Sequence, residues 1–81
     1  MAMSDGYNIA LFNGHIAAAQ SELQSRGAYE SHWGVRYCVE AARSHLRHAL
    51  SYANHARCSA RKALCLRVLN WLNAELRRLP V

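Results

Sequence analysis

The sequence predicts an all-α fold, a compact three-helix bundle in which residues 1–81 form a single helical domain. Three observations lead to this prediction. Proline occurs once and β-branched residues are few, while alanine and leucine are abundant, a composition that favours helix over strand. Apolar residues recur at spacings of three and four, the periodicity of an amphipathic helix. A chain of 81 residues is also too short for a second domain.

The first helix is expected over residues 5–26. Ser4 or Asp5 can cap its start, because a side-chain oxygen there accepts a hydrogen bond from a free backbone N–H one turn later. Gly27 is expected to end the helix in the left-handed conformation, which glycine adopts without a steric penalty. The apolar stripe of this helix consists of Ile9, Phe12, Ile16, Ala19 and Leu23.

Two further helices are expected over residues 32–54 and 59–78, with Ser31 and Ser59 as their caps. The break between them is weak, because it contains no glycine or proline. The alternative is one long helix from residue 33 to residue 78, which would be too long for a monomer of this size and would be completed by a partner chain. We expect the turn, since it gives a compact bundle.

The apolar stripes also predict the core. The residues expected to be buried are Ile9, Phe12, Ile16, Leu23, Val35, Val39, Leu46, Leu64, Val68, Trp71 and Leu72. On the third helix the apolar residues cover roughly 160° of the circumference, which is wide for a helix that faces a single core. We therefore expect a homodimer through the third helix, because a second copy would cover the excess and enlarge a small core.

The charges are distributed unevenly along the chain. Residues 33–81 carry nine lysines and arginines against two acids, a net charge of +7. Residues 1–32 carry one arginine against three acids, a net charge of −2. A basic segment of this kind points to a partner with negative charge, which is an acidic protein or nucleoprotein surface or a nucleic acid.

We call Arg36, Arg43 and Arg47 the arginine row. They share one face of the second helix, roughly 105° from its apolar stripe at 100° per residue, and Glu40 lies among them. Arg57 and Arg61 would lie near the continuation of this face if the helix persisted. Guanidinium groups in a row can meet the phosphates or carboxylates of a partner. The alternative is a solvated helix face, partly paired through Glu40, but the excess of positive charge favours partner binding.

A second candidate surface on the same helix carries Tyr37 and His48 beside small residues. Both side chains are broad and stiff and can hydrogen-bond, as interface residues often do. The alternative is that another helix of the bundle covers this face. The partner-binding residues predicted from the sequence are Arg36, Arg43, Arg47, Arg57, Arg61, Tyr37 and His48.

Cysteines and histidines are the candidates for metal binding. At intervals of 7, 3, 7, 3 and 7 residues the chain places Cys38, His45, His48, His55, Cys58 and Cys65. A tetrahedral zinc site needs four converging ligands, whereas these residues fall on different sides of the helix in projection and lack the paired spacing of zinc fingers. We expect no metal, no cofactor and free thiols, with a zinc-stabilised module as a less favoured alternative.

The sequence contains no constellation that suggests catalysis, so no catalytic residue is predicted. It has no glycine-rich phosphate loop, and Cys38 and His45 are two helical turns apart, too far for a nucleophile and its base. No apolar run reaches the length of a membrane span, and residues 1–5 lack the basic start of a signal peptide. We expect a cytoplasmic, non-enzymatic protein without membrane contact.

The function expected from these features is binding. The protein would dock a basic helical face onto an acidic macromolecular partner and act by occupying it. Small size and the absence of motifs are typical of phage-encoded inhibitors of bacterial machinery, anti-CRISPR proteins among them. The alternative is a basic helical regulator that binds nucleic acid. The chain lacks the turn glycine of a helix–turn–helix motif and an aromatic RNA-binding platform, so its basicity supports non-specific nucleic-acid binding at most.

Overall fold

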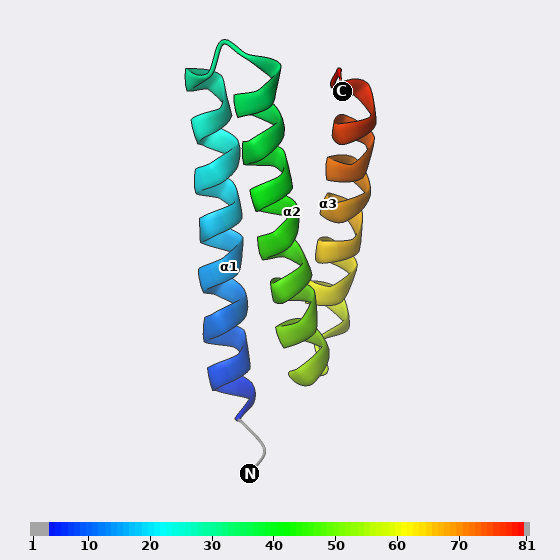
Figure 1. Cartoon of the computed structure of the whole chain (residues 1–81). Coiled ribbons are helices and arrows are strands. Elements are labelled where there is room, and N and C mark those ends of the chain that lie inside the picture. Colours follow the sequence, from blue (N-terminus) through cyan, green and yellow to red (C-terminus); the bar gives the residue numbers. More distant parts are fainter. Residues whose placement is uncertain (1–3, 81) are drawn as a thin grey trace.

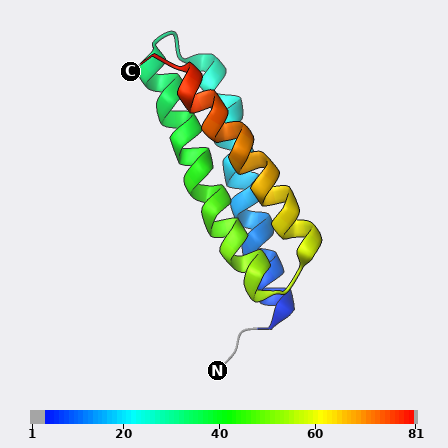
Figure 2. The same ribbon diagram turned by 90° about the vertical axis from the view of Figure 1, so that its right-hand side faces the viewer.

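The computed structural model describes residues 4–80, which fold into three helices that lie side by side (Figure 1). The helices are α1 (Asp5–Ser25), α2 (His32–His55) and α3 (Ser59–Arg78), and a short 3-10 turn, Arg26–Ala28, follows α1. α1 and α3 run in the same direction and α2 runs against them (Figures 1 and 2). The all-α three-helix prediction is confirmed, with each boundary within one residue, and the alternative of one long helix is wrong.

The starts of α1 and α2 are capped by the serines that the sequence indicates. Ser4 Oγ accepts from the Tyr7 N–H, and Ser31 Oγ accepts from the Gly34 N–H, both at 3.2 Å. Each bond satisfies a backbone donor that the first turn of a helix leaves free. None of the helices within residues 4–80 has the length and apolarity needed to cross a bilayer.

Two predictions about helix ends are wrong. Ser59 is the first residue of α3, and Cys58 occupies the cap position without a side-chain capping bond. Gly27 lies inside the 3-10 turn that follows α1, and no glycine in the described part of the chain has a positive φ. The chain after α1 winds into a 3-10 turn, and the Tyr29 N–H donates to the Arg26 carbonyl at 3.2 Å. This bond satisfies a carbonyl at the helix end, so no left-handed glycine is needed there.

The turn between α2 and α3 lies where the sequence predicts it. The Cys58 N–H donates to the Ala53 carbonyl at 3.0 Å, and the Arg57 N–H donates to the Asn54 carbonyl at 3.1 Å. This pair of bonds is the Schellman motif, whose left-handed position is usually a glycine. Here Arg57 occupies that position with φ 56°. The chain therefore reverses direction through an arginine, which explains why the sequence signal for the turn is weak.

α2 is the central helix, and small residues dominate its buried face. Ala42, Ala49 and Ala53 are fully buried there, which allows a close approach of the neighbouring helices. The core is completed by side chains from both neighbours: Phe12 and Ala19 from α1, and Cys65, Leu69, Leu72 and Leu76 from α3. The bundle is thus built around α2, with α1 and α3 packed against it.

The predicted core is confirmed in part. Phe12, Val39, Leu46 and Leu72 are buried, while Ile9, Ile16, Leu23, Val35 and Val68 are partly buried. The prediction is wrong for Leu64 and Trp71, which are 38% and 44% exposed. The reason is that α3 packs on α2 alone: across residues 4–80, no Cα atom of α1 lies within 8 Å of one in α3.

Candidate functional site

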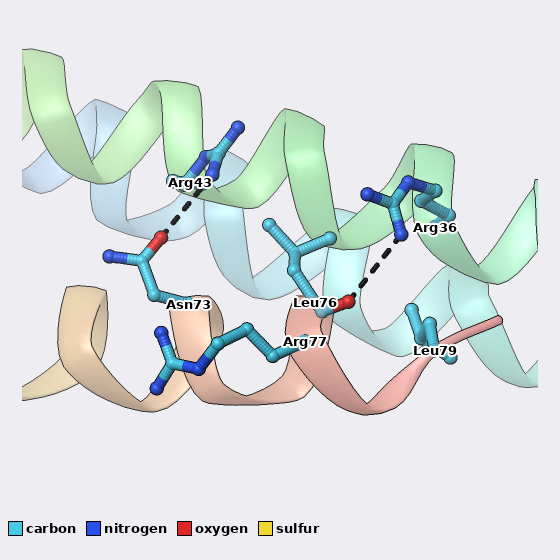
Figure 3. A pocket seen from close by; sticks show the side chains of 6 residues that line it. All are labelled: Arg36, Arg43, Asn73, Leu76, Arg77 and Leu79. Atoms are coloured by element: carbon cyan, nitrogen blue, oxygen red, sulfur yellow. Dashed lines mark hydrogen bonds between the residues drawn. The ribbon is translucent and has the colours of Figure 1, made fainter. Parts of the chain in front are cut away.

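Two members of the arginine row line an open cleft between α2 and α3, with a volume of about 360 Å³ (Figure 3). We call it the arginine cleft, and it is lined by Arg36, Arg43, Asn73, Leu76, Arg77 and Leu79. Because α2 and α3 are antiparallel, the first half of α2 lies beside the end of α3. Residues 40 positions apart, such as Arg36 and Leu76, therefore meet in one site.

Arg36 is held in the arginine cleft by two partners. Its Nη1 donates to the Leu76 carbonyl at 3.4 Å, and its Nε lies 3.2 Å from Glu40 Oε1. The Leu76 carbonyl belongs to the last turn of α3, where helix carbonyls have no partner within the helix. Arg36 therefore caps α3 as well as contributing charge to the cleft.

Arg43 and Arg77 approach the cleft from its two walls (Figure 3). Arg43 Nη1 donates to Asn73 Oδ1 at 3.3 Å, which directs the guanidinium group across the cleft from α2. Arg77 lies one turn after Asn73 on the α3 wall. Each guanidinium carries five N–H donors, so the hydrogen bond of Arg43 leaves most of its donors available to a ligand.

Positive charge is in excess in the arginine cleft. Its lining contains three arginines and no acidic residue. Of these three, Arg36 alone has a carboxylate within ion-pair distance among residues 4–80, that of Glu40. The arrangement can accept an anion with several oxygens, because planar guanidinium groups match carboxylates and phosphates bidentately.

The outer face of α2 continues from the cleft and is exposed. Trp33 and Tyr37 are 73% and 64% exposed, and Glu40, Ser44 and Arg47 follow at helical spacing, also exposed. Arg47 and Tyr37, both predicted as partner-binding residues, therefore belong to this open face beside the cleft. Trp33 was not predicted as a site residue, because at the start of a helix its sequence context does not distinguish it from a core tryptophan.

Arg57 and Arg61 do not extend the arginine row, because α2 ends before them. Arg57 is exposed in the turn. Arg61 reaches back across the bundle: its Nη1 donates to Cys58 Sγ at 3.2 Å, and its guanidinium lies 5.7 Å from the centre of the Phe12 ring. The sequence predicts that Arg57 and Arg61 lie near the arginine row only if the second helix continues past them, and α2 ends at His55.

His48 belongs to a cluster of rings between α1 and α2. The His15 ring stacks on His48 and Tyr52, with centroids 5.1 and 5.6 Å apart. His15 Nδ1 also lies 3.0 Å from His45 Nδ1, so one of these two nitrogens donates to the other. Burial lowers the pKa of His15, and charge on His45 or His48 lowers it further. α1 thus covers part of the Tyr37–His48 face, while Tyr37 stays open.

The three cysteines are free thiols in two kinds of environment. Cys38 and Cys65 are buried, and burial raises the pKa of both. The pKa of Cys58 is lowered, because the Arg61 backbone N–H and guanidinium hydrogen-bond its sulfur. No group of three His, Cys, Asp or Glu side chains within residues 4–80 is arranged to hold a metal ion.

Comparison with protein-family models, with curated proteins and with solved structures found no match to this chain.

Proposed function

We propose that this is a non-enzymatic binding protein that docks the arginine cleft and the outer face of α2 onto an acidic surface of a macromolecular partner. The observation that carries the proposal is the cleft itself, which three arginines line without any acidic residue. A partner that supplies carboxylates or phosphates there would make charge-assisted hydrogen bonds, which are stronger than neutral ones.

The aromatic residues beside the cleft support a protein surface as the partner. Tryptophan, tyrosine and arginine are the residue types that most often dominate binding energy at protein interfaces. Trp33 and Tyr37 are exposed one helical turn apart, and Arg36 lies between them in sequence. Such a surface would act by occupying its target, as inhibitors do, and a cytoplasmic phage-encoded inhibitor of the anti-CRISPR type is the proposal that fits its size.

Binding to nucleic acid is the second candidate function. The same arginines can contact phosphates, and exposed aromatic rings can stack on unpaired bases. The two candidates differ in their response to salt. Counterion release makes the affinity for nucleic acid fall steeply with salt, whatever the base sequence. Binding to a specific protein partner should persist at moderate salt and should discriminate that partner from other proteins.

The experiment is affinity purification from a bacterial lysate with and without nuclease, followed by binding measurements on the partner that is recovered. The double variant Arg43→Glu, Arg47→Glu should remain folded by circular dichroism and lose partner binding, by about 2–5 kcal/mol if the charges are desolvated at the interface. Arg43→Lys keeps the charge and should lose less. Undiminished binding by the folded double variant would falsify the proposed surface. If the partner is recovered only when nuclease is left out, nucleic-acid binding, the second candidate function, is favoured.

A homodimer through α3 is a further part of this proposal. Leu66 is 50% exposed on the side of α3 away from Leu64 and Trp71, and it is the apolar side chain that a second copy would bury there. The same helix carries several arginines whose charges repel in a symmetric pair, so self-association should be weak and should strengthen with salt. Sedimentation equilibrium at low and high salt measures this, and a monomer at high micromolar concentration under both conditions would contradict it.

A further inference from the structure

A second hollow lies between α1 and α3, on the opposite face of α3 from Asn73. We call it the apolar groove. Its volume is about 130 Å³, and Leu46 of α2 contributes to its floor. Its walls are formed by Ile16, Gln20 and Leu23 from α1 and by Leu64 and Val68 from α3. Gln20 is the single polar side chain among the residues that line it, so the groove differs in chemistry from the arginine cleft.

The groove lies where a fourth helix would pack, between α1 and α3. α1 and α3 run in the same direction on either side of α2 (Figure 1), and over residues 4–80 no Cα atom of α1 lies within 8 Å of one in α3. Ile16, Gln20 and Leu23 recur at one-turn spacing on one wall, as do Leu64 and Val68 on the other. Trp71 follows Val68 by one turn, beside the groove. Rows of this spacing are the ridges into which a helix packs, and a fourth helix would complete a four-helix bundle.

The charges around the apolar groove are mainly positive. At one end the Arg26 guanidinium lies 5.4 Å from the centre of the Trp71 ring, and at the other Arg61 lies over Phe12. Arg26, in the turn after α1, therefore reaches towards a ring on α3, and Arg61 on α3 reaches towards a ring on α1. Arg67 is exposed and lies one turn from both Leu64 and Trp71.

One acid belongs to the same side of α3. Glu75 lies one turn after Trp71, and its Oε1 is 3.1 Å from Arg78 Nη1. Its charge is thus already matched by an arginine. Glu22, next to Leu23 on α1, is partly buried and acts on Cys38 of α2. Against these two acids stand Arg26, Arg61, Arg67 and Arg78, so the excess around the groove remains positive. A symmetric second copy would bring these arginines against their own counterparts, which opposes it as the occupant.

We propose that the apolar groove binds an acidic amphipathic helix of a partner protein. Apolar side chains of that helix would occupy the groove, and its carboxylates would meet Arg26, Arg61 and Arg67. This surface is separate from the arginine cleft, and the proposal does not depend on the function proposed for that cleft.

The test uses a synthetic amphipathic helix with leucine at the a and d positions and glutamate beside them. In the Trp33→Phe variant, Trp71 is the remaining tryptophan of the two in the chain, so its fluorescence reports on the groove. The peptide should cause a saturable blue shift, because it covers a ring that is 44% exposed. A peptide with lysine in place of glutamate and a scrambled glutamate peptide should cause none.

Matched variants locate the binding. Leu64→Gln should weaken the peptide at least about tenfold, the equivalent of one buried leucine contact. Leu66→Gln changes another exposed leucine of α3, outside the groove, and should leave the affinity unchanged. Gln20→Glu alters an exposed residue of the other wall, carries little risk to folding, and should weaken the acidic peptide by charge repulsion. Arg67→Gln should weaken the glutamate peptide but not a glutamine version of it.

Four results would overturn the proposal. The first is the absence of a shift with the glutamate peptide at millimolar concentration. The second is an equal loss of affinity in Leu66→Gln and Leu64→Gln, and the third is undiminished binding by Gln20→Glu. The fourth is a blue shift that the protein produces alone as its concentration rises and that Leu64→Gln abolishes, because a second copy would then occupy the groove.

Discussion

At the scale of single residues, Arg36 and Arg43 differ although they share one face of α2. Arg36 donates to a carbonyl in the last turn of α3 and pairs with Glu40, whereas Arg43 bonds only to the Asn73 side chain. Removing Arg36 leaves a helix-end carbonyl without its partner, and removing Arg43 leaves an amide that can turn towards water. The two arginines therefore contribute differently to stability and to binding.

We expect Arg36→Ala to lower the free energy of unfolding by about 1–2 kcal/mol, the usual cost of a lost hydrogen bond with a charged donor. Arg43→Ala should lower it by about 0.5 kcal/mol or less, while removing more of the partner affinity. Urea denaturation of the two variants measures the difference. If Arg36→Ala and Arg43→Ala lower the free energy of unfolding equally, the hydrogen bond from Arg36 to the Leu76 carbonyl does not add to stability as expected.

Cys58 should be the most reactive thiol of the chain. Its sulfur accepts hydrogen bonds from Arg61, which lower its pKa, while burial raises the pKa of Cys38 and Cys65. The thiolate is the nucleophile, so iodoacetamide at neutral pH should modify Cys58 first, as mapped by mass spectrometry. Arg61→Gln removes the guanidinium but keeps the backbone N–H, and it should slow the reaction in part. Faster labelling of either buried cysteine in the folded protein would contradict this.

At the scale of elements, the helices were predictable because their signals are local. Ser4 and Ser31 satisfy the first N–H groups of their helices within one turn, and the apolar stripe of α2 is visible in the sequence as it is in the fold. Packing between helices carries no such local signal. The spacing of Trp71 predicts a core residue, but Trp71 is exposed. The reason is that α1 and α3 each pack on α2, and this packing sets the distance between them.

The candidate site was predictable in part for the same reason. The shared face of Arg36 and Arg43 follows from their spacing on one helix, but the opposite wall of the cleft, Asn73 and Arg77, comes from another element. Arg61 could not be placed without knowing that α2 ends at His55. His15 had no signal at all, since its partners His45 and His48 are on a different helix.

The turn between α2 and α3 stores strain at Arg57. Its φ of 56° places a side chain in the left-handed region, which costs a residue other than glycine roughly 1–2 kcal/mol. Arg57→Gly should raise the free energy of unfolding by about 0.5–1 kcal/mol, because relief of this strain exceeds the entropy that glycine adds to the unfolded chain. Arg57→Ala keeps the strain and should change little. Guanidinium denaturation distinguishes them, and a glycine variant no more stable than the alanine variant would show that the strain is absent.

At the scale of the whole molecule, the two sides of α3 differ from each other in chemistry, and so do the two sides of α2. One side of α3 forms the arginine cleft with α2, and the other forms the apolar groove with α1. On α2, His45, His48 and Tyr52 face α1, while Trp33 and Tyr37 remain open. The seam between α1 and α2 is therefore packed through imidazole rings, which titrate near neutral pH.

The stability of the whole bundle should fall on acidification through this seam. Three imidazoles and Tyr52 meet there, and the pKa of His15 is lowered in the fold by burial and by its histidine neighbours. In the unfolded chain His15 titrates near its ordinary value of about 6.5. Between the lowered pKa and that value the unfolded chain binds more protons, so the free energy of unfolding decreases as the pH falls below about 6.5 and this loss ends below the folded pKa.

Urea denaturation at a series of pH values from above 7 to below 6 tests this, with His15→Gln as the matched variant. Glutamine keeps a polar side chain at the seam but cannot be protonated in this range, so the variant should lose less stability on acidification than the parent chain. His32→Gln is the control, because His32 is exposed at the start of α2, outside the ring cluster. If His15→Gln and the parent lose stability in parallel, the acid sensitivity comes from other groups, and the seam between α1 and α2 does not respond to protonation of His15.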